Sequence, residues 1–104
     1  MSTKSSKTSK VFLESLAGKL TFSSLLLSIR QGEELSQVEF AKLLKVSKQY
    51  ICDIEHGRRT VSPKAAATYA IILGYYPQHF VKLCLQDLID KEGLKLKVDV
   101  HNAA

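Results

Sequence analysis

Residues 35–59, LSQVEFAKLLKVSKQYICDIEHGRR, decide the fold of this chain because they contain the capping residues that start and end two short helices. Ser36, followed three residues later by Glu39, predicts a reciprocal capping box at the start of the first helix. Ser47 is a good N-cap for the second helix, and Gly57 supplies the left-handed residue that commonly ends a helix. The stretch therefore predicts two short helices joined by a tight turn.

The second of these helices is predicted to turn a polar face to solvent. Ile51 and Ile54 lie three residues apart and are expected to point inward. The outward positions then hold Lys48, Gln49, Cys52 and Asp53. In the major groove of DNA, lysine can donate to guanine, glutamine can bracket adenine and aspartate can accept from cytosine. Any surface helix can carry such residues, but the caps, the turn and the local charge together favour a helix-turn-helix that reads DNA.

Basic side chains crowd the same stretch. The chain has 15 lysine and arginine residues against 10 aspartate and glutamate residues, a formal net charge of +5. This total only weakly indicates an acidic partner, so the placement of the charge matters more. The basic residues in and beside the helix pair are Lys42, Lys45, Lys48, Arg58 and Arg59, and they outnumber the nearby acidic residues Asp53 and Glu55. They predict double-stranded DNA as a partner, because its phosphates would lie against a positive surface.

Further helices are predicted on both sides of the pair. The one before it begins near residue 21 and stops at Gly32, with an apolar stripe of Phe22, Leu25, Leu26 and Ile29. The next begins at Ser62-Pro63 and ends at Gly74, with a core face of Ala65, Ala66, Tyr69, Ile72 and Leu73. The last runs from Pro77 to near Gly93 and is apolar at Phe80, Val81, Cys84, Leu85, Leu88 and Ile89.

The two ends of the chain follow other patterns. Residues 1–10 are rich in serine, threonine and lysine and are expected to form a disordered basic tail, either merely solvated or touching DNA. Residues 11–20 are a short extension in which residues 11–16 could form a sixth helix. Residues 94–100 alternate apolar and charged side chains, which predicts a strand. A lone strand needs a partner, so we expect pairing across a dimer or onto another protein; the alternatives are pairing within the chain near residues 19–22 and a frayed tail.

Several classes of protein are disfavoured. The two cysteines, Cys52 and Cys84, have no zinc-ligand spacing and are predicted to be reduced packing thiols. No apolar run approaches the roughly 18 residues that a membrane span needs, so we expect a cytoplasmic protein. The three histidines have no carboxylate or thiol spacing for a catalytic triad or a metal site. We therefore expect no enzyme, no metal and no cofactor.

Across about residues 21–74 the chain resembles the Cro/C1-type helix-turn-helix regulators, the XRE-like repressors. The motif elements of that family fall on Leu35-Ser36-Gln37, Glu39-Phe40-Ala41, Val46-Ser47, Ile51 and Ile54-Glu55-His56-Gly57. The resemblance implies an all-α, lambda-repressor-like bundle of about five helices. The alternating apolar and charged residues 94–100 predict a short C-terminal β-strand in addition. The resemblance implies that the recognition helix begins at Ser47 and reads bases through Lys48, Gln49 and Asp53. It also implies phosphate contacts from Gln37, Ser47, Tyr50, Arg58 and Arg59.

The same resemblance makes Arg30 and Glu55 a structural ion pair between helices, so Glu55 is left out of the base-reading set. One position departs from the family pattern. The turn residue before Val46, usually glycine in this family, is Lys45 here. A left-handed lysine costs roughly 1–2 kcal/mol more than glycine would, or else the turn has a different shape.

The expected organisation is a helix-turn-helix domain over residues 21–76 and a C-terminal helix and strand over residues 77–104. One recognition helix contacts few bases, so we expect a homodimer on a palindromic operator. The predicted dimer or partner interface is Phe80, Cys84, Leu88, Leu94, Leu96, Val98 and Val100. A looser resemblance to HigA- and HipB-type antitoxins implies autorepression and neutralisation of a toxin, a ribonuclease or a protein kinase. The alternatives are a stand-alone phage-type repressor and a protein-interaction adaptor that does not read DNA.

Overall fold

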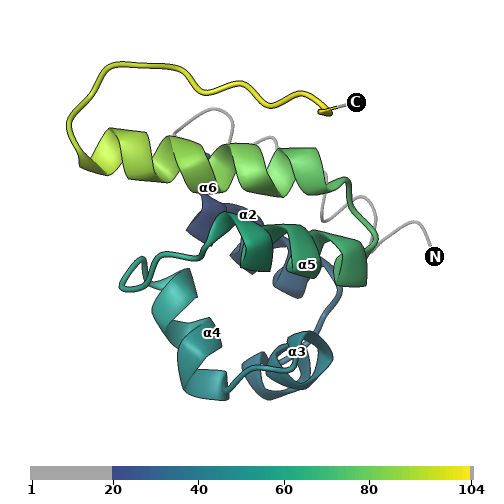
Figure 1. The fold of residues 1–104 in the computed structure, drawn as a ribbon. Coiled ribbons are helices and arrows are strands. Elements are labelled where there is room, and N and C mark those ends of the chain that lie inside the picture. Colours follow the sequence, from purple (N-terminus) through teal and green to yellow (C-terminus); the bar gives the residue numbers. More distant parts are fainter. Residues whose placement is uncertain (1–19, 104) are drawn as a thin grey trace. The chain divides into compact units, whose positions relative to one another are not determined.

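The computed structural model describes residues 20–103, which form helices, turns and an extended C-terminal segment (Figure 1). The helices in this range are α2 (Phe22–Gly32), α3 (Gln37–Leu44), α4 (Lys48–Glu55), α5 (Pro63–Leu73) and α6 (Pro77–Lys91). The expected all-α fold with a helix-turn-helix is therefore confirmed. The predicted basic tail and the possible helix at residues 11–16 lie outside the described residues. Within the described part of the chain, no helix is long and apolar enough to cross a membrane.

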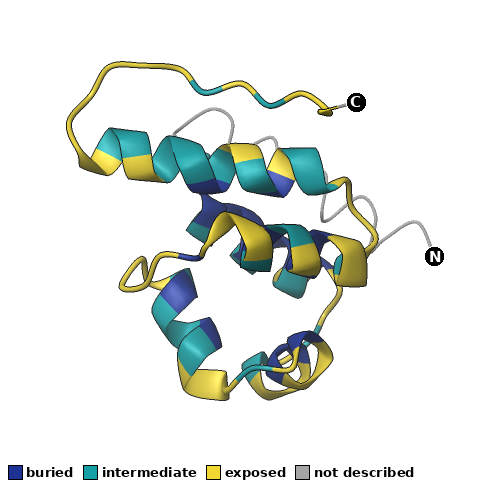
Figure 2. Cartoon of the chain, viewed as in Figure 1, coloured by how far each residue is buried: buried dark blue, intermediate teal, exposed yellow. Residues whose placement is uncertain are grey.

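The chain divides into two compact units, with the boundary between Arg59 and Thr60. In the first unit, α4 packs against both α2 and α3. Its buried apolar residues are Phe22, Leu25, Leu26, Ile29, Phe40, Ala41, Leu44, Ile51 and Ile54 (Figure 2). The apolar stripe predicted for α2 is thus buried as expected, because a helix in water is stabilised mainly by packing such a face.

Local hydrogen bonds fix the starts of α3 and α4. The hydroxyl of Ser36 accepts from the Glu39 N–H at 3.0 Å, and the Glu39 carboxylate accepts from the Ser36 N–H at 2.8 Å. The predicted capping box is therefore present, and the hydrogen bond from the Ser36 backbone is the main reason that the pKa of Glu39 is lowered. The Ser47 hydroxyl accepts from the Tyr50 N–H at 3.0 Å, which caps α4 as predicted.

The ends of these helices use left-handed residues, and not all of them are glycine. Gly57 has φ 73° just after α4, as predicted. α2 ends at Gly32 as predicted, but Gly32 is itself helical, and the left-handed residue that follows is Glu34, with φ 58°. Lys45 ends α3 with φ 61° and ψ 44°. The turn thus keeps its left-handed shape although lysine replaces glycine.

In the second unit, α5 packs against α6. The buried residues of this unit are Val61, Ala66, Tyr69, Ala70, Phe80 and Cys84. The Cys84 thiol donates to the Val61 carbonyl at 2.7 Å, and burial raises the pKa of this thiol. Ile72 was wrongly assigned to the core and is 38% exposed, because the buried stripe of α5 follows Ala66, Tyr69 and Ala70 instead.

The predicted C-terminal strand does not form, since no residue from 20 to 103 is in a β-strand. Residues 94–103 instead run along α6 (Figure 1), and side chains of that helix satisfy part of their backbone. The Val98 N–H donates to Gln86 Oε1, and Gln86 Nε2 donates to the Leu96 carbonyl, each at 2.8 Å. Gln78 Nε2 also donates to Asn102 Oδ1 at 2.9 Å. The alternating pattern therefore gives an extended segment, but an amide side chain replaces the strand partner.

The left-handed lysine generates a stability prediction. Lys45→Gly should stabilise the protein by about 1 kcal/mol, because glycine adopts this conformation without the Cβ clash. The measurement is the urea midpoint of unfolding followed by circular dichroism. Lys42→Gly is the matched control, since Lys42 is inside α3, where glycine should cost about 1 kcal/mol. A loss of stability in both variants would contradict the strain assigned to Lys45.

Candidate nucleic-acid interface

The outward face of α4 is built as its sequence predicts. Ile51 and Ile54 are fully buried at 0% exposure and anchor the helix in the first unit. Lys48 and Gln49, in the first turn of α4, are exposed. Asp53, one turn further on, is intermediate in burial. The helix therefore offers solvent the polar side chains that could enter a groove, while its buried face leaves little freedom to rotate about its axis.

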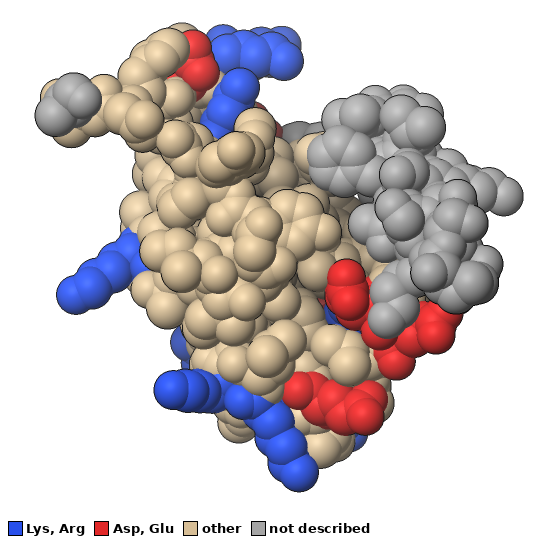
Figure 3. All heavy atoms as spheres, turned by 90° about the vertical axis from the view of Figure 1, so that its right-hand side faces the viewer, with Lys and Arg blue, Asp and Glu red and all other residues tan. Residues whose placement is uncertain are grey.

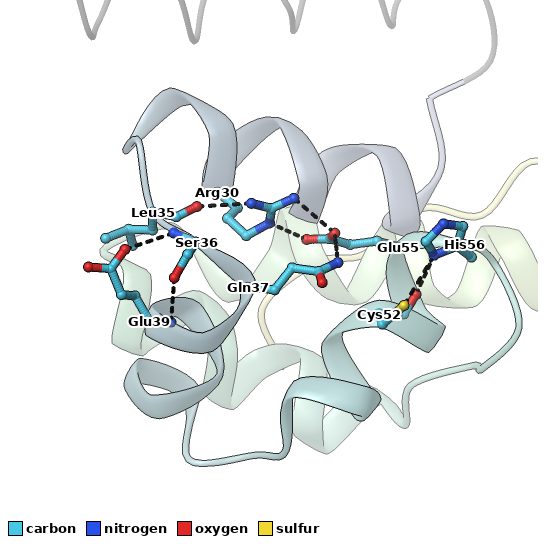
Figure 4. Close-up of polar contacts among 8 residues, drawn as sticks. All are labelled: Arg30, Leu35, Ser36, Gln37, Glu39, Cys52, Glu55 and His56. Carbon is cyan, nitrogen blue, oxygen red and sulfur yellow. Dashed lines mark hydrogen bonds and ion pairs between the residues drawn. The ribbon is translucent and has the colours of Figure 1, made fainter.

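A buried ion pair ties α4 to α2 (Figure 4). Arg30 Nε donates to Glu55 Oε2 at 2.6 Å, and Arg30 Nη2 donates to Glu55 Oε1 at 3.1 Å. The exposed fractions of the two side chains are only 15% and 4%. Arg30 Nη1 also donates to the Leu35 carbonyl at 2.9 Å, at the connection to α3. The two residues predicted to pair thus do so with bidentate geometry, which makes the interaction directional as well as charged.

Gln37 belongs to the same network. Its Nε2 donates to Glu55 Oε1 at 2.9 Å, so the carboxylate holds the first residue of α3 as well as Arg30 (Figure 4). The family resemblance implied only a phosphate-contacting role for Gln37. An amide nitrogen carries two N–H groups, so one can bind Glu55 while the other remains for a phosphate oxygen. The structural role of Gln37 was missed because it depends on Glu55, which is 18 residues away.

A second polar cluster lies on the exposed side of α4. Asp53 Oδ1 accepts from Gln49 Nε2 at 2.9 Å and from Arg58 Nη2 at 3.0 Å. Hydrogen bonds from Gln49 first, and then from Arg58, hold the pKa of Asp53 below its ordinary value. The hydrogen bond to Asp53 in turn raises the pKa of Arg58. Two predicted base-reading residues and one predicted phosphate-contacting residue are therefore in direct contact.

The remaining predicted residues lie at the two ends of α4. The Arg59 guanidinium stacks on the Tyr50 ring, with Cζ 4.8 Å from the ring centroid, a cation–π contact that the sequence did not indicate. Nδ1 of His56 lies 2.8 Å from the carbonyl oxygen of Cys52 (Figure 4), so the imidazole interacts with the last turn of the helix. The cation–π contact thus places Tyr50 and Arg59 side by side, and both residues are expected to approach phosphates.

Charge is unevenly distributed over the first unit. Its exposed acidic residues include Glu33, Glu34 and Glu39, which lie between α2 and α3 and in the first turn of α3. On the face drawn in Figure 3, most of the visible acidic side chains gather at the lower right, a further one lies apart at the top, and lysine and arginine side chains project at the top, left and bottom. The exposed basic residues beside and within α4 are Lys45, Lys48, Arg58 and Arg59. The turn before α4 and the loop after it are therefore the positive part of the unit.

The predicted interface residues of the second unit differ in exposure. Phe80 and Cys84 are 0% and 4% exposed, so they are core residues and offer no surface to a partner in this conformation. Leu88, Leu94 and Leu96 are 39%, 48% and 59% exposed. Val98 and Val100 are half-buried. Among the predicted interface residues, the three leucines are therefore the ones that offer a well-exposed apolar side chain.

Comparison with known proteins identifies the fold on which these residues lie. A family model described as helix-turn-helix matches residues 26–80, more than half of the chain. The match includes all of α3, α4 and α5 and most of α2. No curated protein and no solved structure gave a match to the chain.

The buried ion pair generates a second stability prediction. Arg30→Ala should destabilise the protein by about 3–5 kcal/mol, because it leaves the buried Glu55 carboxylate without its counter-charge. The free energy of unfolding in urea is the measurement. Arg58→Ala is the matched control: it removes a guanidinium that is 53% exposed, so it should destabilise the protein far less than Arg30→Ala does. Similar small losses for the two variants would exclude the structural role of Arg30.

Proposed function

The chain belongs to the Cro/C1-type helix-turn-helix family of DNA-binding transcription regulators, and we propose that it represses transcription as a homodimer on a palindromic operator. The observation that carries this proposal is the construction of α4. Its apolar side is fully buried, its first turn exposes Lys48 and Gln49, and basic side chains lie at both of its ends. This combination suits a helix that lies in the major groove between two phosphate backbones.

The proposed contacts divide into two kinds. Lys48 and Gln49 read base edges, because both are exposed at the N-terminal end of the helix, which is the part that enters the groove in this motif. Phosphates are contacted by Gln37, Ser47, Tyr50, Arg58 and Arg59. The first group sets sequence preference, and the second sets affinity and its dependence on salt.

Selection from a random duplex library at physiological salt tests the function. A near-palindrome with half-sites about one helical turn apart should be enriched, because two copies present two recognition helices to one face of the DNA. Gln49→Ala should lose preference at one base pair in each half-site. Arg58→Ala should weaken binding to all sequences and reduce the salt slope by about one. Retention of DNA without enrichment would exclude sequence-specific repression and leave the adaptor function.

We propose that α6 and residues 94–103 form the surface for the second copy. Support comes from Leu88, Leu94 and Leu96, whose exposed fractions of 39%, 48% and 59% are high for leucine. Burial of such side chains is the usual driving force of association. The same leucines could instead bind a different protein, which is the basis of the antitoxin function.

The double variant Leu94→Ser with Leu96→Ser should shift the protein from dimer to monomer in sedimentation velocity. Its effect comes from the loss of apolar surface at the interface, and the helices should remain folded. Lys95→Ser with Lys97→Ser is the matched control, since these exposed neighbours carry charge and no large apolar group. An unchanged sedimentation coefficient in the leucine variant would remove this segment from the dimer interface.

A second candidate is an antitoxin that represses its own operon and neutralises a toxin encoded beside it, a ribonuclease or a protein kinase. Two of the three exposed leucines lie in the C-terminal segment, and all three follow the residues matched by the family, so they are available for a function beyond DNA binding. Expression of the adjacent gene alone should then arrest growth, and co-expression of this protein should restore it. Growth that is unaffected by the adjacent genes favours a stand-alone phage-type repressor.

A further inference from the structure

One oxygen atom of Asp53 connects the side chain proposed to read bases with a side chain proposed to contact phosphate. Oδ1 accepts from Gln49 Nε2 at 2.9 Å and from Arg58 at two atoms, Nη2 at 3.0 Å and Nε at 3.2 Å. Gln49 lies one turn earlier on α4, and Arg58 follows the helix. The Asp53 side chain is 25% exposed, against 53% for that of Arg58. The carboxylate is thus the more enclosed group of this pair.

This arrangement fixes which way the Gln49 amide faces. An ionised carboxylate only accepts hydrogen bonds, so the Gln49 nitrogen, and not its oxygen, has to point to Asp53. The amide keeps one N–H and its oxygen for other partners. Adenine presents N7, an acceptor, and the N6 amino group, a donor, in the major groove. The free N–H and oxygen of Gln49 are the complementary pair, so the bond to Asp53 prepares the amide to bracket adenine.

The same contacts make direct base reading by Asp53 less favourable. Cytosine would have to be bound by the other carboxylate oxygen, because Oδ1 already receives three donor atoms. Arg58 supplies the cation that offsets the repulsion between this carboxylate and DNA phosphates, so the carboxylate can remain beside the DNA without contacting a base. Since both hydrogen-bond partners lower the pKa of Asp53, the carboxylate remains ionised at neutral pH and keeps its purely accepting character.

We propose that Asp53 is a positioning residue for DNA recognition: it orients the Gln49 amide towards adenine and holds Arg58 beside the helix for a phosphate contact. The assignment rests on the proposed function of α4 as a recognition helix. It differs from the cytosine-reading role that the sequence predicts for Asp53, because a positioning residue acts at the base pair of Gln49 and not at one of its own.

The test measures the DNA affinities of Asp53→Ala, Gln49→Ala and the double variant. Each is measured on the selected operator and on duplexes that carry every single base-pair change. Asp53→Ala should reduce discrimination about tenfold at the base pair that Gln49→Ala affects, within the range expected for one bidentate contact. The double variant should lose no more discrimination there than Gln49→Ala alone, because the two residues act through one contact. Asp53→Asn keeps an accepting oxygen for Gln49 and should retain most of the discrimination.

Glu92→Ala is the control for charge, since it removes one negative charge from an exposed residue of the second unit. It should change the affinity for all duplexes alike and leave base preference intact. Loss of discrimination at a different base pair in Asp53→Ala would overturn the proposal and make Asp53 a reader. A change in Asp53→Ala that matches Glu92→Ala would overturn it as well, because only charge would then matter.

A measurement without DNA separates this inference from the proposed function. In the free protein, the side-chain amide of Gln49 should have restricted motion by ¹⁵N relaxation, and Asp53→Ala should release it. Equal mobility in both proteins would overturn the positioning role whatever the DNA results. If the unmodified protein selects no sequence, the proposed function fails, and the amide measurement still decides whether Asp53 orders Gln49.

Discussion

The ion pair between Arg30 and Glu55 is the interaction on which the geometry of the first unit depends. Glu55 is the last residue of α4, and its carboxylate receives Arg30 from α2 and Gln37 from the start of α3. With its side chain only 4% exposed, this carboxylate is satisfied by the protein and not by water. A buried pair of this kind adds little net stability compared with apolar packing, but it strongly disfavours arrangements that separate its members. It therefore specifies how three helices meet.

The direction of α4 relative to α3 depends on a conformation that its sequence does not favour. Lys45 is left-handed at φ 61°, although lysine pays a steric cost there that glycine would avoid. The caps at Ser36 and Ser47 and the buried Ile51 and Ile54 on α4 compensate for this strain. Strain that is retained by its surroundings is common at functional turns, and this turn directs the helix that carries Lys48 and Gln49.

The second unit shows how side chains can replace a missing strand. The alternating residues after position 93 have the right pattern for a sheet, yet no strand is present for them to pair with in the described residues. Gln86 supplies one donor and one acceptor at the required spacing and holds the backbone at Leu96 and Val98. The result is an extended segment with Leu94 and Leu96 turned to solvent, which suits association with another molecule.

The sequence by itself determined the helix boundaries and the inward side of α4, because caps, turns and apolar periodicity depend on residues within about four positions of each other. Resemblance to a family added the pairing of Arg30 with Glu55, 25 residues apart. Only the tertiary structure decided that Gln37 binds Glu55, that Ile72 is exposed and that residues 94–103 follow α6. These three features depend on which side chains and backbone groups from distant parts of the sequence come together when the chain folds. The contact between Gln49 and Asp53 has helical spacing and could be expected from the sequence. Only the structure shows that Arg58 donates to the same Asp53 oxygen, which indicates a positioning role for this carboxylate.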